Sequence, residues 1–289
     1  MRTPGALGRK LERLALRASV FFKFFRGKMP ELPEVEAAMR RLKKAVEGKT
    51  IANAKAIHPA LLRQFPDATA RRLRQRTVDS VERRGKHQLL HLDDGATLHA
   101  HFRMNGDWLI TSTKDALDRF TRAFIELTDG TRIELQDSRA LAALKLHPKG
   151  EAALPSLGME ANDAKLDAPH LKSVLAKRRG PIKPALMDQK LIAGLGNIYA
   201  AEALWRSMIS PRATASSISR PRLERLADAI AFVLNSKNRP PGRYTDKEFR
   251  GRFQVYDREG EPCRRCGTTI KRIQQAGRST YFCPKCQRA

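Results

Sequence analysis

The sequence predicts an α+β fold with an N-terminal β-sandwich and flanking helices, a helical second domain and a C-terminal zinc ribbon. Three observations carry this prediction. Short alternating segments with hairpin turns occupy roughly residues 51–150, helical periodicity follows in 151–237, and all four cysteines fall within the last 27 residues. With 289 residues and a hydrophobic fraction of 41%, the chain is long enough for two domains with proper cores.

The charge of the chain points to a polyanionic partner. Its formal net charge is +26, and so basic a folded protein most often binds nucleic acid, because each neutralised phosphate releases counterions. A basic protein of membrane surfaces is the competing interpretation. No apolar run approaches membrane-spanning length, and no amphipathic anchor stands out apart from one short aromatic stretch near the N-terminus.

Residues 1–28 differ in composition from the rest. They contain eight basic residues and one acid, so that removing them takes away +7 and leaves +19. We interpret residues 1–29 as a basic extension absent from the mature protein, read from a start codon placed too far upstream; an organellar transit peptide or a working basic extension are the alternatives. A secretory signal is excluded because Lys23 breaks the short apolar run.

The run Met29–Glu36 places a proline directly after an internal methionine and three glutamates after that proline. If translation starts at Met29 and that methionine is removed, Pro30 becomes a free secondary amine. Within a chain, the proline nitrogen is an amide without a proton. A terminal proline amine can instead attack an electrophilic carbon.

A helix is predicted from Leu32. Pro33 suits the first turn, the following glutamates complement the helix N-terminus, and Gly48 ends the helix. One apolar stripe follows its length: Val35, Met39, Leu42 and Val46. The helix dipole disfavours a cation at this end, so we expect it to lower the pKa of a terminal amine at Pro30, although the nearby carboxylates oppose that effect.

Residues 51–150 read as strands joined by turns. Hairpin turns are predicted at 93–95 and 129–130, where aspartate precedes glycine. The candidate strands are Ile51–His58, Thr77–Glu82, His87–Leu92, Thr97–Arg103, Arg122–Leu127 and Thr131–Gln136.

Residues 151–237 read as helices separated by glycine and proline. The candidate helices are Ala168–Lys177, Pro184–Ala193, Ile198–Ser207 and Pro221–Ser236. The polar, basic segment 237–253 is predicted to be a mobile loop.

The cysteines form two Cys-x2-Cys pairs separated by sixteen residues: Cys263, Cys266, Cys283 and Cys286. Two such pairs supply four thiolates with the tetrahedral geometry that Zn²⁺ prefers. Two disulfides are the alternative, which a basic chain without a secretory signal disfavours. The site is predicted to be structural, because four protein ligands leave no open position on the metal.

Three motifs in this order resemble the formamidopyrimidine-DNA glycosylases: Pro30–Glu36, the segment Gly194–Ala200 and the four-cysteine ribbon. The resemblance runs with interruptions from about residue 30 to 288. It implies a β-sandwich catalytic domain in 30–150, a domain with a helix-two-turn-helix motif in 151–240, and a lesion-loop remnant with the zinc ribbon in 241–289. It also implies a DNA groove between the domains.

The resemblance further implies catalytic roles for three residues. Pro30 would attack the sugar C1′, because the resulting iminium acidifies the neighbouring sugar proton and permits elimination. Glu31 would act as general acid and base, protonating the opening sugar ring. Lys86, which follows a turn glycine, would support catalysis beside the lesion and its phosphate.

Seven further positions match residues that contact DNA in the family. They comprise phosphate and lesion-strand contacts together with side chains that fill the gap left by the flipped base: His101, Met104, Arg139, Leu141, Lys183, Asn197 and Arg278. Glu202 is expected to order buried amides near the active site.

The sequence departs from the family at several positions. Residues 137–142 read Asp-Ser-Arg-Ala-Leu-Ala, so the family's second arginine is lost and Leu141 replaces an aromatic wedge. The interdomain turn 157–161 lacks the family's prolines, which predicts a looser linker that touches no chemistry. The loop that covers an oxidised purine in relatives looks shortened before residue 254, which weakens the case for 8-oxoguanine as the preferred substrate.

The predicted function is a DNA repair glycosylase and abasic-site lyase that acts as a monomer on damaged double-stranded DNA, with one structural Zn²⁺. Alternatives are a family member that binds damage without cutting if residues 1–29 are retained, an endonuclease VIII-like preference for oxidised pyrimidines, and a generic zinc-ribbon nucleic-acid binder. The expected compartment is the cytoplasm and nucleoid, with organellar targeting by residues 1–28 as the alternative.

Overall fold

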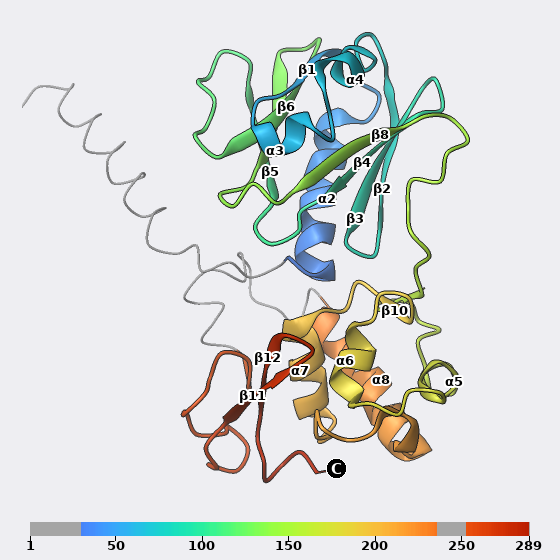
Figure 1. Cartoon of the computed structure of the whole chain (residues 1–289), viewed down its shortest axis with the longest axis vertical. Helices are drawn as coiled ribbons and strands as arrows, with labels where there is room; N and C mark the ends of the chain where they lie inside the picture. Colours follow the sequence, from blue (N-terminus) through green and yellow to red (C-terminus); the bar gives the residue numbers. More distant parts are fainter. Residues whose placement is uncertain (1–29, 236–252, 289) are drawn as a thin grey trace, which may run out of the picture.

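The computed structural model describes residues 30–235 and 253–288. It has a strand-rich part and a helical part that ends in a small ribbon, as the α+β prediction requires (Figure 1). The basic extension 1–29 and nearly all of the predicted loop 237–253 lie outside the described residues. Within the described ranges, no helix is long and apolar enough to cross a membrane.

Helix α2 (Leu32–Val46) forms where the sequence predicts it. Pro33 lies in the first turn, and the Glu31 backbone N–H, which no helical carbonyl could reach, donates to Glu34 Oε2 at 3.0 Å. The helix stops before Gly48, whose φ is +72°. Its buried stripe faces the β-sandwich and comprises Val35, Ala38, Leu42 and Val46.

Two four-stranded antiparallel sheets share one apolar core with α2. The first has the order β1 (Ile51–Ala56), β6 (Thr121–Leu127), β7 (Thr131–Gln136), β5 (Asp107–Ser112). The second has the order β2 (Val78–Arg84), β3 (His87–Leu92), β4 (Thr97–His101), β8 (Ala143–His147). Short helices α3 (Pro59–Leu62) and α4 (Asp67–Arg71) lie between β1 and β2 in the chain.

Strands β5 and β8 were not predicted. Strand β5 forms the edge of one sheet by pairing with β7, and β8 forms the edge of the other by pairing with β4. In both cases the partner strand is not the neighbour in sequence. Both hairpin turns are present, and Gly95 and Gly130 adopt positive φ there (+79° and +84°). The predicted β-sandwich is therefore complete only with two strands whose pairing is tertiary.

The helical part contains α5 (Ala168–Leu175), α6 (Ile182–Met187), α7 (Asn197–Arg206) and α8 (Arg220–Leu234). The predicted helix Pro184–Ala193 is wrong in its second half. Asp188 leaves the helical region at ψ 109°, and its carboxylate accepts from Lys190 N at 3.0 Å, which turns the chain. Residues Ile192–Ala193 then form β10, which pairs in parallel with β9 (Met159–Glu160).

The ribbon consists of β11 (Lys271–Gln275) and β12 (Arg278–Phe282), joined at Gly277 with φ +71°. Strand β12 lies against α7 in Figure 1 and in its side-chain contacts. Helix α7 therefore stands between the ribbon and the start of α2, and this position organises the site described next.

Candidate active site

The carboxylate of Glu31 joins the two parts of the molecule. It is 2% exposed and accepts hydrogen bonds from Ile198 N at 2.7 Å and Tyr199 N at 3.2 Å, in the first turn of α7. These N–H groups lack helical partners and carry the positive end of the helix dipole, so they bind an anionic group strongly. The residue that directly follows Pro30 is thereby fixed in position.

Gly196, which precedes α7, leaves room for two side chains to approach the same point. A Cβ atom built on it would come within 2.6 Å of both Glu31 Oε1 and Lys86 Nζ. Lys86 is only 7% exposed, and it reaches this point from the turn between β2 and β3. A carboxylate and an ammonium are thus brought together beside the start of α2.

Burial shifts the proton affinity of both groups. Burial raises the pKa of Glu31 above its usual value, while Lys86 and the Ile198 and Tyr199 amides oppose the rise. Burial lowers the pKa of Lys86, and Arg278 adds to this effect, whereas Glu31 and Glu34 oppose it. A buried carboxyl with a raised pKa can hold a proton and release it, as a general acid requires.

A second pair of predicted residues, Lys183 and Asn197, lies where α7 meets the ribbon. Lys183 Nζ donates to Thr280 Oγ1 at 2.8 Å and also to Asn197 Oδ1. Asn197 Nδ2 donates to Ser279 O at 3.1 Å. Burial lowers the pKa of Lys183 to about 8, with Arg278 adding to the decrease. Lys183 in α6 and Asn197 at the start of α7 are therefore both held by β12, the strand that carries Arg278.

Glu202 lies one turn further along α7 and orders the chain that enters the ribbon. Its carboxylate accepts from Gln254 N at 2.8 Å, Val255 N at 3.0 Å and Tyr256 N at 2.9 Å. The expectation that Glu202 binds buried amides is confirmed. Tyr256 in turn hydrogen-bonds to Asn197, and burial raises its pKa.

The predicted wedge residues lie on two loops that touch. Asp137 is 1% exposed, and its carboxylate accepts from the amides of Arg139 (2.9 Å), Leu141 (2.6 Å) and Ala142 (2.7 Å). This arrangement presents the Leu141 side chain, which is 45% exposed.

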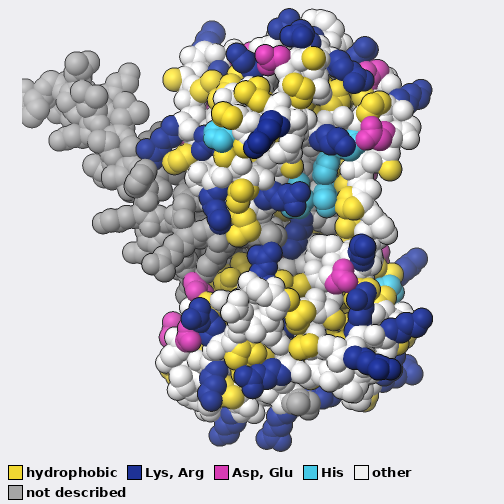
Figure 2. Space-filling model, viewed as in Figure 1, with side chains coloured by type: hydrophobic (Ala, Val, Ile, Leu, Met, Phe, Trp, Pro, Cys, Tyr) yellow, Lys and Arg dark blue, Asp and Glu magenta, His cyan; other side chains and the backbone are white. Residues whose placement is uncertain are grey.

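The second loop carries Met104, which is half-buried. It is tied to the first loop by Asn105 Nδ2, which donates to Ser138 Oγ at 2.9 Å. His101 precedes this loop, and its Nδ1 accepts from Arg103 N at 2.9 Å. Burial lowers the pKa of His101 to about 3, so the imidazole is neutral at pH 7. Figure 2 shows histidine, lysine and arginine side chains gathered at the waist between the two parts.

Glu160 is a residue near the site whose contacts the sequence did not predict. The linker was predicted to be loose and remote from chemistry, but Glu160 accepts from Gly85 N at 2.6 Å and Arg83 Nη1 at 2.5 Å, and it pairs with Arg84. Gly85 adjoins Lys86, so the linker carboxylate holds the turn that presents the lysine. The signal was present in the sequence as consecutive arginines before Gly85, but their partner lies 75 or more residues away.

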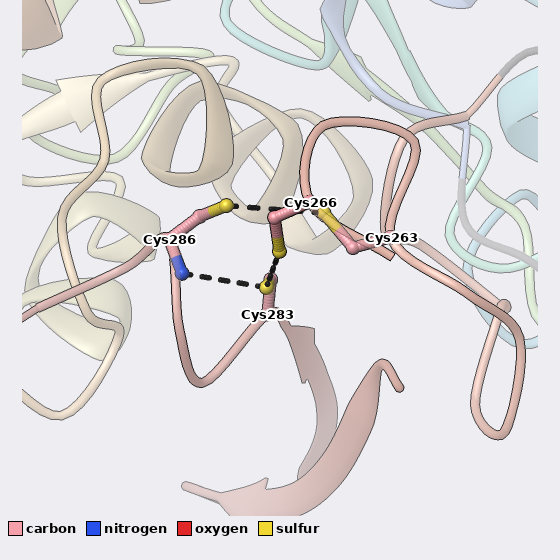
Figure 3. Close-up of side chains that lie close together, drawn as sticks. All are labelled: Cys263, Cys266, Cys283 and Cys286. Atoms are coloured by element: carbon pink, nitrogen blue, oxygen red, sulfur yellow. Dashed lines mark hydrogen bonds between the residues drawn. The ribbon is translucent and has the colours of Figure 1, made fainter. Parts of the chain in front are cut away.

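The four cysteines converge from two turns (Figure 3). Their sulfur atoms all lie within 4.8 Å of one another, with 3.5 Å between Cys266 and Cys283 and 4.0 Å between Cys263 and Cys286. The S–S edge of a tetrahedral zinc site is about 3.8 Å for Zn–S bonds of about 2.3 Å. All four are free thiols. The donor set fits one structural Zn²⁺ and not the alternative of two disulfides.

The first cysteine turn docks on the C-terminal end of α7. The Arg265 guanidinium lies 4.0 Å from the centre of the Trp205 ring, and its Nη1 donates to Trp205 O at 3.1 Å. Trp205 O is one of the last carbonyls of the helix and also accepts from Met208 N at 3.2 Å. One helix therefore contacts Glu31 at its N-terminus and the zinc ribbon at its C-terminus.

Comparisons with known proteins match this arrangement along most of the chain. Family models match for the formamidopyrimidine-DNA glycosylase N-terminal domain at residues 29–144, for its H2TH domain at 157–239, and for a zinc finger found in FPG and IleRS at 260–289. A formamidopyrimidine-DNA glycosylase of Ruegeria sp. is 40% identical over 283 residues, and one of Lactiplantibacillus plantarum is 34% identical over 273. Each match covers 90% of this chain and 100% of the relative.

Solved structures give the same result. The Lactococcus lactis formamidopyrimidine-DNA glycosylase non-covalently bound to DNA containing an AP site superposes with a TM-score of 0.81 at 30% identity. MutM in complex with DNA containing carbocyclic 8-oxo-G gives 0.80 at 31%. Both comparisons cover 90% of this chain and 100% of the other.

We predict that Gly196→Ala lowers the free energy of unfolding by about 1–3 kcal/mol, because the added Cβ displaces the buried Glu31 carboxylate or the Lys86 ammonium. Gly180→Ala is the matched control, since nothing lies within 4 Å of a Cβ there. Urea denaturation followed by circular dichroism measures both. Equal stabilities of the two variants would contradict the prediction, because they would show that the site accommodates the added Cβ without cost.

We predict that Glu31→Gln makes stability less dependent on pH. Because the pKa of Glu31 is raised in the folded protein above 4.5, the folded state binds the proton more tightly, and stability falls as pH rises from about 4.5 through the raised value. The glutamine variant lacks this loss. Its stability relative to the parent should therefore improve from pH 5 to pH 8, measured by thermal melting. A parallel pH dependence of the two proteins would contradict the prediction.

Proposed function

The chain belongs to the formamidopyrimidine-DNA glycosylase family, and we propose that it excises damaged bases from double-stranded DNA and cleaves the strand through Pro30, Glu31 and Lys86. The observation that carries this proposal is the buried Glu31 carboxylate, held by the first turn of α7 beside Lys86 and directly after Pro30. The activity is that of a DNA glycosylase and abasic-site lyase.

In the proposed reaction, the amine of Pro30 attacks the sugar C1′, and the bond from C1′ to the base breaks. The amine supplies its electron pair to C1′, and its proton passes to the departing base. The C1′–O4′ bond then breaks as the ring oxygen accepts a proton from Glu31, which leaves an iminium between the nitrogen and C1′. This step requires Pro30 to be the first residue. The family-model match that begins at residue 29 supports an active form beginning at Pro30.

The burial of Glu31 and its raised pKa support a proton-transfer role for this residue. Its raised pKa allows it to carry a proton to the ring oxygen as the sugar opens, and the two α7 amides then stabilise the carboxylate that remains. Because Glu31 adjoins Pro30 in the chain, the acid and the nucleophile reach the same sugar. Lys86 stabilises the anionic form of Glu31. We propose that it also contacts the phosphate of the lesion.

Strand cleavage follows from the iminium. It acidifies the C2′ proton, whose removal expels the 3′ phosphate by β-elimination, and a second elimination expels the 5′ phosphate. Lys183, Asn197 and Arg278 are proposed to hold phosphates of the lesion strand, and His101 contacts one as a neutral hydrogen-bond donor. Met104, Leu141 and Arg139 occupy the space that the flipped nucleotide vacates.

The substrates are oxidised or ring-opened bases, and solved relatives were crystallised with DNA containing Fapy-dG, an abasic site or carbocyclic 8-oxo-G. The Leu141 substitution leaves a preference for oxidised pyrimidines, of the endonuclease VIII kind, as the second candidate. We place the activity in the cytoplasm and nucleoid, because the curated relatives come from bacteria, whose DNA lies there. We also propose that the domains divide at residues 150 and 240 and that residues 1–29 are a basic extension absent from the mature enzyme.

The nucleophile is tested by borohydride trapping on abasic DNA. We expect protein that begins at Pro30 to form a covalent adduct and protein that begins at Met1 to form none, because only the first has a free amine at Pro30. Binding of both forms to undamaged DNA controls for folding. Failure of the Pro30 form to be trapped would overturn the enzyme proposal, and mass spectrometry of the peptide confirms the attachment site.

The zinc ribbon is tested with Cys283→Ser. Loss of the metal should release β12, and with it Arg278 and the anchor of Lys183 and Asn197, weakening DNA binding by roughly a hundredfold or more for two lost charged contacts. Lys285→Ala, an exposed residue between two of the cysteines, is the control. Binding that survives metal removal, measured by fluorescence anisotropy alongside zinc content, would refute the role of the ribbon.

A further inference from the structure

The segment between β1 and β2 concentrates arginine at a distance from the candidate active site. Four of the six residues in 71–76 are arginines, and all four are exposed: Arg71, Arg72, Arg74 and Arg76. They begin at the end of α4, which lies at the end of the strand-rich part farthest from the helical part (Figure 1). Lysine and arginine side chains are visible at this end of the molecule in Figure 2.

The arginines project from a rigid base. Phe65 and Leu73 are fully buried, which packs the segment on the sandwich core. Its backbone pairs with the start of β1, because Gln75 N donates to Ile51 O and Ile51 N donates to Arg76 O, both at 2.8 Å. The guanidinium groups are therefore displayed from fixed backbone positions, and little conformational entropy of the backbone remains to be lost on binding.

The charges of this segment are mostly not neutralised. Arg76 pairs with Asp94 at 3.2 Å, and Arg74 bonds to the neutral Asn53. For Arg71 and Arg72, no ion pair occurs within 30–235 and 253–288. Two exposed arginines of the helical part, Arg178 and Arg220, instead pair with Asp188 and Glu224. We name Arg71, Arg72 and Arg74 the α4 arginine patch.

We propose that the α4 arginine patch binds the phosphate backbone of a second stretch of DNA, separate from the stretch that enters the active site. The guanidinium fork matches phosphate oxygens bidentately, and closely spaced unpaired arginines on a fixed surface suit a polyanion with regular charges. Because the patch lies at the far end of the domain, it reaches DNA other than the turn around the lesion. A second attachment keeps the protein at high effective concentration near DNA while the first site searches.

The test fills the active site with a duplex of about 12 base pairs, roughly one helical turn, that carries a non-cleavable abasic-site analogue. A labelled undamaged duplex of the same length is then titrated, and its binding is followed by fluorescence anisotropy at several salt concentrations. The zinc-loaded full chain is compared with R71Q/R72Q/R74Q. The charge-matched control is R178Q/R220Q/R222Q, which removes the same number of positive charges from the helical part.

We expect the patch variant to lose most of the second-duplex binding and the slope of log affinity against log salt to fall by about 2.7, for three phosphates at about 0.9 each. The control should bind like the parent. Excision from the short duplex should be unchanged in both variants, so a failure of the excision chemistry is distinguishable from a failure of this proposal.

Two results would overturn the proposal directly: no second-duplex binding by the parent, or equal binding by the patch and control variants. A third is displacement of the labelled duplex by polyglutamate as effective as displacement by DNA of the same charge, which would indicate an acidic polypeptide as the partner. A long duplex with one lesion separates the two sources of the second stretch. Bridging within one DNA molecule makes the patch variant weaker on the long duplex, whereas a separate molecule leaves that affinity unchanged and alters only the second-duplex titration.

Discussion

The structure depends on a buried carboxylate at the N-terminus of a helix. Moving Glu31 out of water is costly unless its oxygens are hydrogen-bonded, and the Ile198 and Tyr199 amides provide those bonds across the boundary between the two parts. The absence of a side chain at Gly196 follows from the same contact, since a Cβ there would collide with the carboxylate. The start of α2, and the proline before it, are therefore positioned by a helix that lies more than 160 residues later.

The same helix carries the constraint to the zinc ribbon. Asn197 bonds to Ser279 of β12 at the N-terminal end of α7, and Arg265 docks on Trp205 at the other end. The ribbon is too small to bury a core of its own, so the metal supplies its folding energy. Metal binding, the proposed phosphate contacts and the placement of Glu31 are consequently linked through one rigid element, and the metal acts in it as a structural ion.

Elements with strong local signals could be predicted from sequence, and those defined by distant pairing could not. Helix α2 carries its proline, glutamates and apolar stripe within its own residues, and the cysteine spacing specifies the metal site by itself. Strand β10 has only two residues and exists because it pairs with β9, so the local pattern suggested helix. Glu160 escaped notice for the same reason, since its role lies in contacts to Arg83 and Gly85 across the sequence.

The wedge loop shows that backbone geometry and side-chain identity are separate determinants of recognition. Asp137 accepts from three loop amides, and none of those bonds depends on the side chains at positions 139, 141 and 142. Ala140 sits at φ +53°, a conformation that costs energy for a residue with a Cβ, and the three bonds maintain it. The loop can therefore keep its shape while Leu141 replaces an aromatic ring. In the proposed role of this loop, the surface offered to DNA is what changes, because leucine fills a base step without stacking; discrimination of the opposite base would then depend on the side chain and not on the fold.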